Sequence, residues 1–187
     1  MKTISKIPVI LLLALVGLFS CVEQTDTELD TLPYFDLKGF IELKANEVDS
    51  VHVIKVSRVQ DQEEKIETVY TREELNNEFE VFKEADINKR SLIKSYDTKV
   101  SNDQLIHELF PKAEGKVKFL KISYFEDQVS SISIKQVEKN LFYSSITLGN
   151  IYMNNATHKI DHYDIETTQK IWFLRPNNMK ISGVLKN

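Results

Sequence analysis

Apolar and polar residues alternate along most of the second half of the chain, which is typical of β-strands that bury one face. The alternation predicts strands over residues 117–125, 129–137, 141–148, 159–165, 169–174 and 179–185. Turns are expected between them, at residues 126–127, 138–140, 149–150, 167–168 and 176–178. Because these connections are short, we expect successive strands to pair in antiparallel fashion and to form a meander.

The first half of the chain carries two helical patterns, in which apolar residues recur three or four positions apart. Asp36 is placed to cap the first helix, whose apolar stripe runs from Leu37 to Val48. Thr71 and Glu74 have the spacing of a capping box at the start of the second helix, which should end near Ala85. Each helix therefore presents one apolar stripe for packing.

The other segments of the first half are predicted to be extended. Residues 51–59 are β-branched and roughly alternating, and residues 65–70 return after a polar turn, so the two should form a hairpin. Residues 91–100 also favour an extended chain. Residues 104–110 fit either a short helix that ends before Pro111 or a strand, and the long extended stretch that follows favours the strand.

Together these elements predict an α+β fold, a curved antiparallel β-sheet with meander topology packed with about two helices. The sheet would have one apolar face, and the two helices are the elements available to cover it. The half-barrel of periplasmic lipoprotein carriers is an analogous shape. We expect residues 34–187 to form this fold as a single domain.

The first twenty residues have the pattern of a bacterial signal peptide. Lys2 and Lys6 precede an apolar run over residues 8–19, which is too short to span a bilayer comfortably. The run ends in Leu18-Phe19-Ser20-Cys21, which resembles the lipobox of bacterial lipoproteins, although Phe19 is bulkier than the usual residue. The resemblance implies that residues 1–20 are removed and that Cys21 carries several acyl chains, which anchor stably. An uncleaved helix or an ordinary secretory leader is the alternative.

Residues 21–33 would then form an acidic, lipidated tether between the membrane and the domain. The stretch after Cys21 is polar, with Glu23, Asp26 and Glu28 among its residues, so we expect a flexible spacer. In the familiar sorting rule, Asp directly after the cysteine retains a lipoprotein in the inner membrane, and Val22 occupies that place. The sequence therefore predicts an outer-membrane protein that faces the periplasm or the cell surface, with the membrane as a partner through Cys21.

Composition narrows the class of protein further. Charged residues make up 28% and hydrophobic residues 42%, which is ordinary for a globular domain. Cys21 is the only cysteine, so no disulfide pair is expected to staple the domain. The net charge is −4, and it becomes −6 when the two leader lysines are removed. An acidic chain without a long basic run does not favour nucleic acid as a partner.

Catalytic and metal-binding patterns are weak in this sequence. His158 and His162 are four residues apart, which would suit a metal on a helix. On the strand expected here they would be about 13 Å apart, too far to share one ion. The chain has no Gly-x-Ser-x-Gly motif, and its paired acidic residues fall in a polar turn and in a helix's first turn. We therefore predict no catalytic residue, metal site or cofactor, and no enzymatic activity.

Aromatic residues are concentrated in the predicted meander. They fit a pocket for an apolar ligand, the hydrophobic core, or a protein-binding face, and the core is favoured. The set comprises Phe119, Tyr124, Phe125, Phe142, Tyr143, Tyr152, Tyr163, Trp172 and Phe173. The leading interpretation is a non-catalytic binding or interaction module of the cell envelope, with a hydrophobic ligand or a protein as its partner. The alternative is a structural or assembly partner of an outer-membrane protein complex.

Three short segments look like those of uncharacterised Bacteroidota outer-membrane lipoproteins. They are YFDLKGFI at residues 34–41, DINK at residues 86–89, and YDI at residues 163–165 with QKI at residues 169–171. The likeness covers nearly the whole chain after the leader. It implies an envelope lipoprotein, and it brings no known activity and no functional residues to transfer.

Overall fold

The computed structural model of the chain describes residues 31–186. The predicted signal peptide, Cys21 and the tether as far as Asp30 lie outside the described residues. No helix within residues 31–186 has the length and apolar character needed to cross a membrane.

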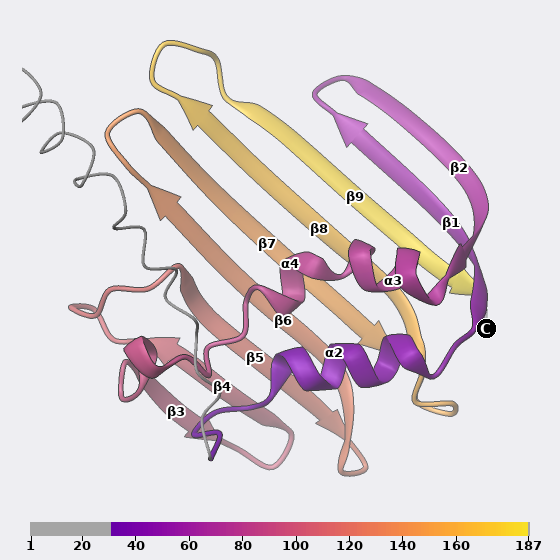
Figure 1. Cartoon of the computed structure of the whole chain (residues 1–187), viewed down its shortest axis with the longest axis horizontal. Coiled ribbons are helices and arrows are strands. Elements are labelled where there is room, and N and C mark those ends of the chain that lie inside the picture. The colour runs from indigo at the N-terminus through magenta and orange to yellow at the C-terminus, as the bar shows by residue number, and fades with distance from the viewer. Residues whose placement is uncertain (1–30, 187) are drawn as a thin grey trace, which may run out of the picture.

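Within the described part of the chain, nine antiparallel strands form one open sheet (Figure 1). The strand order is β2-β1-β9-β8-β7-β6-β5-β4-β3, so β3 to β9 pair in sequence order and the β1–β2 hairpin adds to β9. The strands are β1 (Ser50–Val59), β2 (Gln62–Thr71), β3 (Tyr96–Val100), β4 (Gln104–Leu109), β5 (Val117–Phe125), β6 (Gln128–Lys139), β7 (Tyr143–Met153), β8 (Ile160–Ile171) and β9 (Asn177–Lys186). The predicted antiparallel meander is confirmed, and residues 104–109 are a strand.

The helices all lie on one face of the sheet, as Figure 1 shows. They are α2 (Leu37–Asn46), α3 (Arg72–Glu78), α4 (Glu80–Lys83) and the short 3₁₀ helix η2 (Arg90–Leu92). Both predicted caps are present, because Asp36 accepts from the Gly39 amide and Thr71 and Glu74 form the capping box. The hydrogen bonds from Thr71 hold the pKa of the Glu74 carboxyl below its ordinary value.

The second predicted helix is not continuous, and this corrects the expectation for residues 71–85. The backbone tightens at Phe79, where the Phe82 amide donates to the Phe79 carbonyl three residues back. The break turns both phenyl rings toward the sheet, where each is fully buried and they meet edge to face at 6.2 Å. In a regular α-helix, side chains three residues apart point in directions that differ by about 60° around the helix axis.

Two predicted turns are also wrong, because β7 and β8 run straight through residues 149–150 and 167–168. Gly149 pairs with Ile165 inside the sheet, and its missing side chain makes room for a ring. A Cβ atom there would lie 2.9 Å from Cε1 of Phe82. The glycine therefore marks a close approach of a helix side chain to the strand rather than a turn. Residues 91–100 are extended only from Tyr96 onward.

The hydrophobic core fills the space between the helices and the covered face of the sheet. Its fully buried side chains come from both layers, and they include Leu37, Ile41, Leu75, Phe79, Phe82, Leu120, Ile122, Ile132, Ile134, Ile151 and Tyr163. Burying a side chain of this size contributes about 1.5–3 kcal/mol relative to leaving it in water. The burial of these side chains holds α2, α3 and α4 against this face of the sheet.

The start of the domain is clamped to the segment that follows α4, and both segments are among those that carry the likeness described above. The Asn88 side chain accepts from the Tyr34 amide at 3.1 Å and donates to the Phe35 carbonyl at 3.0 Å. Asp86 accepts from the Lys38 amide at 3.0 Å. The YFDLKGFI and DINK segments are therefore neighbours in space.

A buried histidine completes this clamp from β4. Nε2 of His107 accepts a hydrogen bond from the Phe35 amide at 3.2 Å, and Nδ1 lies 2.9 Å from the Thr98 hydroxyl. Burial lowers the pKa of His107. The imidazole is therefore held neutral, with Nε2 free to act as the acceptor.

Candidate functional site

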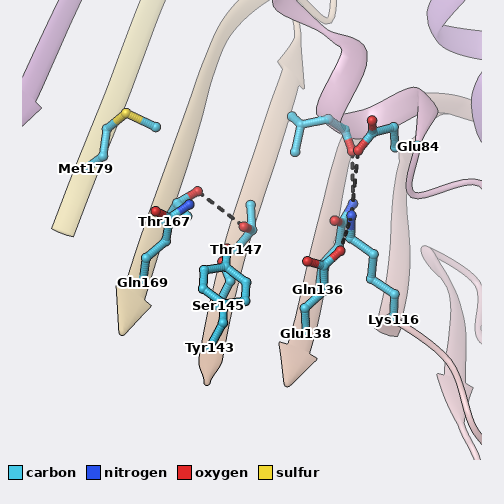
Figure 2. A pocket seen from close by; sticks show the side chains of 11 residues that line it. Glu84, Lys116, Gln136, Glu138, Tyr143, Ser145, Thr147, Thr167, Gln169 and Met179 are labelled. Carbon is cyan, nitrogen blue, oxygen red and sulfur yellow. Dashed lines mark hydrogen bonds and ion pairs between the residues drawn. The ribbon is translucent and has the colours of Figure 1, made fainter. Parts of the chain in front are cut away.

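An open cleft lies on the helix-bearing face of the sheet, beyond the end of α4 (Figure 2). Its volume is about 230 Å³. The lining side chains come from α4, the loop before β5, and β6 to β9. They are Val81, Glu84, Lys116, Gln136, Glu138, Tyr143, Ser145, Thr147, Thr167, Gln169 and Met179.

The cleft continues the same face of the sheet that forms the core, but with polar residues in place of apolar ones. On β6, buried Ile132 and Ile134 are followed two residues on by Gln136. On β8, Tyr163 and Ile165 are followed by Thr167. These residues all point to the same face, because alternate residues of a strand share a face. That face therefore changes from apolar to polar along each strand, at the place where the helices end.

Hydroxyl and amide groups are the main polar groups on the floor of the cleft. Gln136 donates to the Val81 carbonyl at 2.9 Å, which ties α4 to β6. The hydroxyls of Thr147 and Thr167 lie 3.2 Å apart across β7 and β8. Each hydroxyl has more hydrogen-bonding capacity than this one contact uses.

Charged groups of the cleft are confined to one side, where one lysine pairs with two carboxylates. Nζ of Lys116 lies 2.6 Å from Glu138 and 3.6 Å from Glu84. Burial acts to lower the pKa of Lys116, but the hydrogen bonds and charges of the two carboxylates outweigh it and raise the pKa. The lysine is therefore charged at neutral pH, and both carboxylates face a cation rather than a free site.

The histidine pair singled out in the sequence does not form a site. His158 lies in the β7–β8 turn with a positive φ of 55°, and His162 lies on β8. Nδ1 of His162 is 2.8 Å from Asp161, and its ring stacks on Tyr152 with centroids 4.3 Å apart. Among residues 31–186, no three His, Cys, Asp or Glu side chains are grouped so that they could hold a metal ion.

The aromatic residues of the meander separate into different environments. Tyr163 alone among the nine is fully buried, at 1% exposure, so the expectation that the set forms the core is wrong for most of it. Phe142, Trp172 and Phe173 are 61%, 74% and 78% exposed. With their neighbours they form an apolar cluster at the ends of two hairpins. We call this cluster the aromatic tip, and it consists of Leu141, Phe142, Ile171, Trp172, Phe173 and Leu174.

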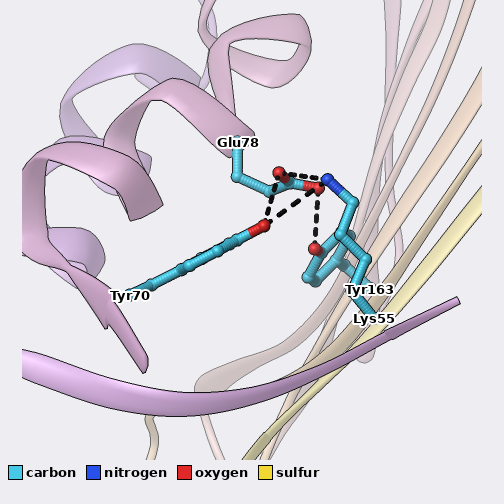
Figure 3. A network of polar contacts seen from close by, with 4 residues as sticks. All are labelled: Lys55, Tyr70, Glu78 and Tyr163. Carbon is cyan, nitrogen blue, oxygen red and sulfur yellow. Dashed lines mark hydrogen bonds and ion pairs between the residues drawn. The ribbon is translucent and has the colours of Figure 1, made fainter. Parts of the chain in front are cut away.

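A polar network inside the domain was not apparent from the sequence (Figure 3). Glu78, at the end of α3, accepts from the Tyr163 hydroxyl at 2.7 Å and pairs with Lys55 at 2.7 Å. The Tyr70 hydroxyl donates to the same carboxylate at 3.3 Å. The network therefore joins α3 to β1, β2 and β8.

Burial and the Glu78 charge set the protonation of this network. Burial raises the pKa of Tyr163, and the neighbouring carboxylate raises it further. Burial acts to lower the pKa of Lys55, and its contact with Glu78 reverses the direction and raises it. At neutral pH the Lys55 side chain is therefore an ammonium, and the Tyr70 and Tyr163 phenols are neutral.

Comparison of the chain with protein-family models, with curated proteins and with solved structures finds no match.

Proposed function

We propose that this chain is a lipid-anchored protein of the bacterial outer membrane whose domain is a non-catalytic binding module for a small polar ligand. The open cleft beyond α4 carries the proposal. Three properties support it: the cleft lies on the protected face of the sheet, its floor is rigid strand, and its free groups are uncharged hydrogen-bonding groups. The Cys21 anchor rests on the lipobox and stays a prediction of the sequence.

A polar ligand suits the cleft better than a hydrophobic one. An apolar ligand would cover Gln136, Ser145 and Thr167 with a surface that cannot use the hydrogen-bonding capacity left over from their contacts within the protein. A hydroxyl- or amide-bearing molecule such as a saccharide would satisfy them. A half-barrel holds its ligand between a curved sheet and a helix. We propose that this chain resembles it in one respect, because the sheet and α4 both contact the ligand.

The anchor predicts a specific chemical modification. In cells fed an alkyne-bearing fatty acid, the full chain should take up the label and partition with the outer membrane. Cys21→Ala should lose the label completely, because the thiol is the acyl acceptor, and should leave the leader uncleaved. In-gel fluorescence after membrane fractionation measures both effects. An unlabelled wild-type chain would refute the anchor.

The cleft predicts binding that depends on its two threonine hydroxyls. Titrating the isotope-labelled full chain in detergent micelles with an N-acetylglucosamine oligomer should shift amide resonances around Ser145, Thr147 and Thr167. Replacing both threonines with valine keeps their shape and should weaken binding about ten-fold, since each lost hydrogen bond is worth about 0.5–1.5 kcal/mol.

The matched control for this titration is Thr168→Val. Thr168 is next to Thr167 on β8 and faces the opposite side of the sheet, so its variant should bind as the wild type does. Palmitate is the competing probe. Shifts caused by palmitate and not by the saccharide would contradict a polar ligand, and so would an absence of shifts with both.

A further inference from the structure

The aromatic tip is an exposed apolar cluster at one end of the sheet. It is made by the β6–β7 turn and the β8–β9 loop, which lie side by side at the upper left of Figure 1. Leu141 is 89% exposed, more than any other large hydrophobic side chain in residues 31–186. A contiguous exposed cluster of this kind marks a surface that binds another apolar surface.

The two hairpins hold the tip in a fixed arrangement. The Trp172 amide donates to the Phe142 carbonyl at 2.9 Å, and the rings of these two residues are 6.4 Å apart. Tyr143 pairs with Ile171 at the end of the ladder between β7 and β8. The tip is thus presented by rigid strands, so little further ordering is required when it binds.

The charged residues within the two segments that form the tip, residues 139–143 and 170–177, are all positive. Lys139 and Lys170 flank it on β6 and β8, and Arg175 follows it in the loop. Residues 139–143 and 170–177 contain no Asp or Glu, although the whole chain has a net charge of −4. The side chains of all three cations are exposed, and none of these side chains forms an ion pair or hydrogen bond with another described residue.

From these observations we infer that the aromatic tip inserts into the interfacial region of a lipid bilayer that carries anionic headgroups. Trp and other amphipathic aromatic residues favour the membrane–water interface, and Lys and Arg beside them bind anionic lipid. The tip projects from the end of the sheet, which suits a planar surface. The apolar side chains would enter the acyl boundary while the three cations stay at headgroup level.

The neighbouring β1–β2 turn limits how the domain approaches the surface. The Gln60 amide donates to the Asn178 carbonyl, so this turn is at the same end of the sheet. Asp61 lies in the turn and Glu64 lies near the start of β2, and an anionic surface repels both. The domain therefore tilts so that β6 to β8 come closest to the bilayer.

Trp172 is the only tryptophan of the chain, so its fluorescence reports on the tip alone. The full chain is reconstituted in vesicles of phosphatidylcholine and phosphatidylglycerol, with and without bromine on the acyl chains near the headgroups. We expect brominated lipid to reduce Trp172 emission at least about two-fold and acrylamide to quench it poorly. Attachment through the N-terminal region alone leaves Trp172 in water, so the readout is independent of Cys21.

Two variants separate the apolar and the electrostatic contributions. Leu141→Ser with Phe173→Ser should abolish quenching by brominated lipid, because the inserted side chains are gone. Replacing Lys139, Lys170 and Arg175 with Gln should lower the equilibrium constant for insertion of the tip into anionic vesicles about 100-fold, at roughly five-fold for each cation. The matched control is Leu43→Ser with Val100→Ser, two exposed apolar residues far from the tip, and it should behave as the wild type.

Two results would overturn the inference. Trp172 that is fully accessible to acrylamide on the vesicles, with no quenching by brominated lipid, means that the tip stays in water. The second result is that Trp172 is protected from acrylamide in cell membranes but not in vesicles of lipid alone. In that case the tip binds a protein surface instead. Neither result bears on the cleft, so failure here is distinct from failure of the proposed function.

Discussion

Replacing Gly183 with alanine should lower the free energy of unfolding by about 3 kcal/mol, at the upper end of the range for overpacking a core. A Cβ atom at Gly183 would lie 2.2 Å from Cε1 and 2.5 Å from the hydroxyl oxygen of Tyr163. The ring cannot swing away, because its hydroxyl donates to Glu78 and the ring packs edge to face with Phe79, with centroids 5.2 Å apart. Urea unfolding followed by circular dichroism measures the loss.

A double variant tests whether the Tyr163 ring causes this loss. Tyr163→Ala is destabilising by itself, but it removes the atoms that a Cβ at Gly183 would strike. Adding Gly183→Ala in that background should therefore lower the free energy of unfolding by less than about 0.5 kcal/mol. This value is the margin within which the effects of independent substitutions add. Equal losses from Gly183→Ala in both backgrounds would show that another contact is responsible.

Removing the Glu78 carboxylate should be at least as damaging. Glu78→Ala leaves the Lys55 ammonium, whose side chain is 16% exposed, without its counter-ion, and leaves the Tyr163 hydroxyl without its acceptor. Breaking one side of a buried ion pair typically costs about 3–5 kcal/mol. We expect a loss of this size in urea unfolding at pH 7. The surface pair of Arg58 and Glu63 supplies the control, and Glu63→Ala should change stability by less than about 1 kcal/mol.

The same network makes stability depend on alkaline pH. The folded-state pKa values of Lys55 and Tyr163 are raised above their ordinary values of 10.5 and 10.0. Their stabilisation is therefore complete below about pH 10 and is lost as the pH rises through the raised values. Glu78→Ala should have a flatter dependence above pH 10 than the wild type. A parallel decline in both proteins would place the alkaline sensitivity elsewhere, with Tyr96 the first residue to test, since burial raises its pKa to about 12.

Short-range patterns in the sequence were sufficient to predict the meander, the β1–β2 hairpin and both helix caps. Each depends on residues within a few positions of one another, such as Asp36 with Gly39 or Thr71 with Glu74. Gly149 misled the prediction, because glycine occurs both at turns and at strand positions where another group packs closely on the backbone. Only the position of Phe82, 67 residues earlier in the chain, distinguishes the two cases.

The candidate sites depend on long-range contacts, and the sequence could not show them. Glu78 looks like one more polar residue on a helix, and its partner Tyr163 is 85 residues away. Thr147 was expected on a strand and Thr167 in a turn, yet both lie on strands of the helix-bearing face, in a part that the helices do not cover. The composition of the aromatic tip was visible, but its exposure was not, since Tyr163 and Trp172 are equally typical of a buried strand.

The clamp at the start of the domain has a mechanical consequence. A force applied to the chain before Thr31 would act first on Tyr34 and Phe35. Asn88 and His107 hold the backbone of these two residues by hydrogen bonds. These few hydrogen bonds would bear the force before any strand pair of the sheet does. They would also yield sooner in acid, because a protonated His107 can no longer accept from the Phe35 amide. The chain would then lengthen at the N-terminal end of the domain while the sheet stays intact.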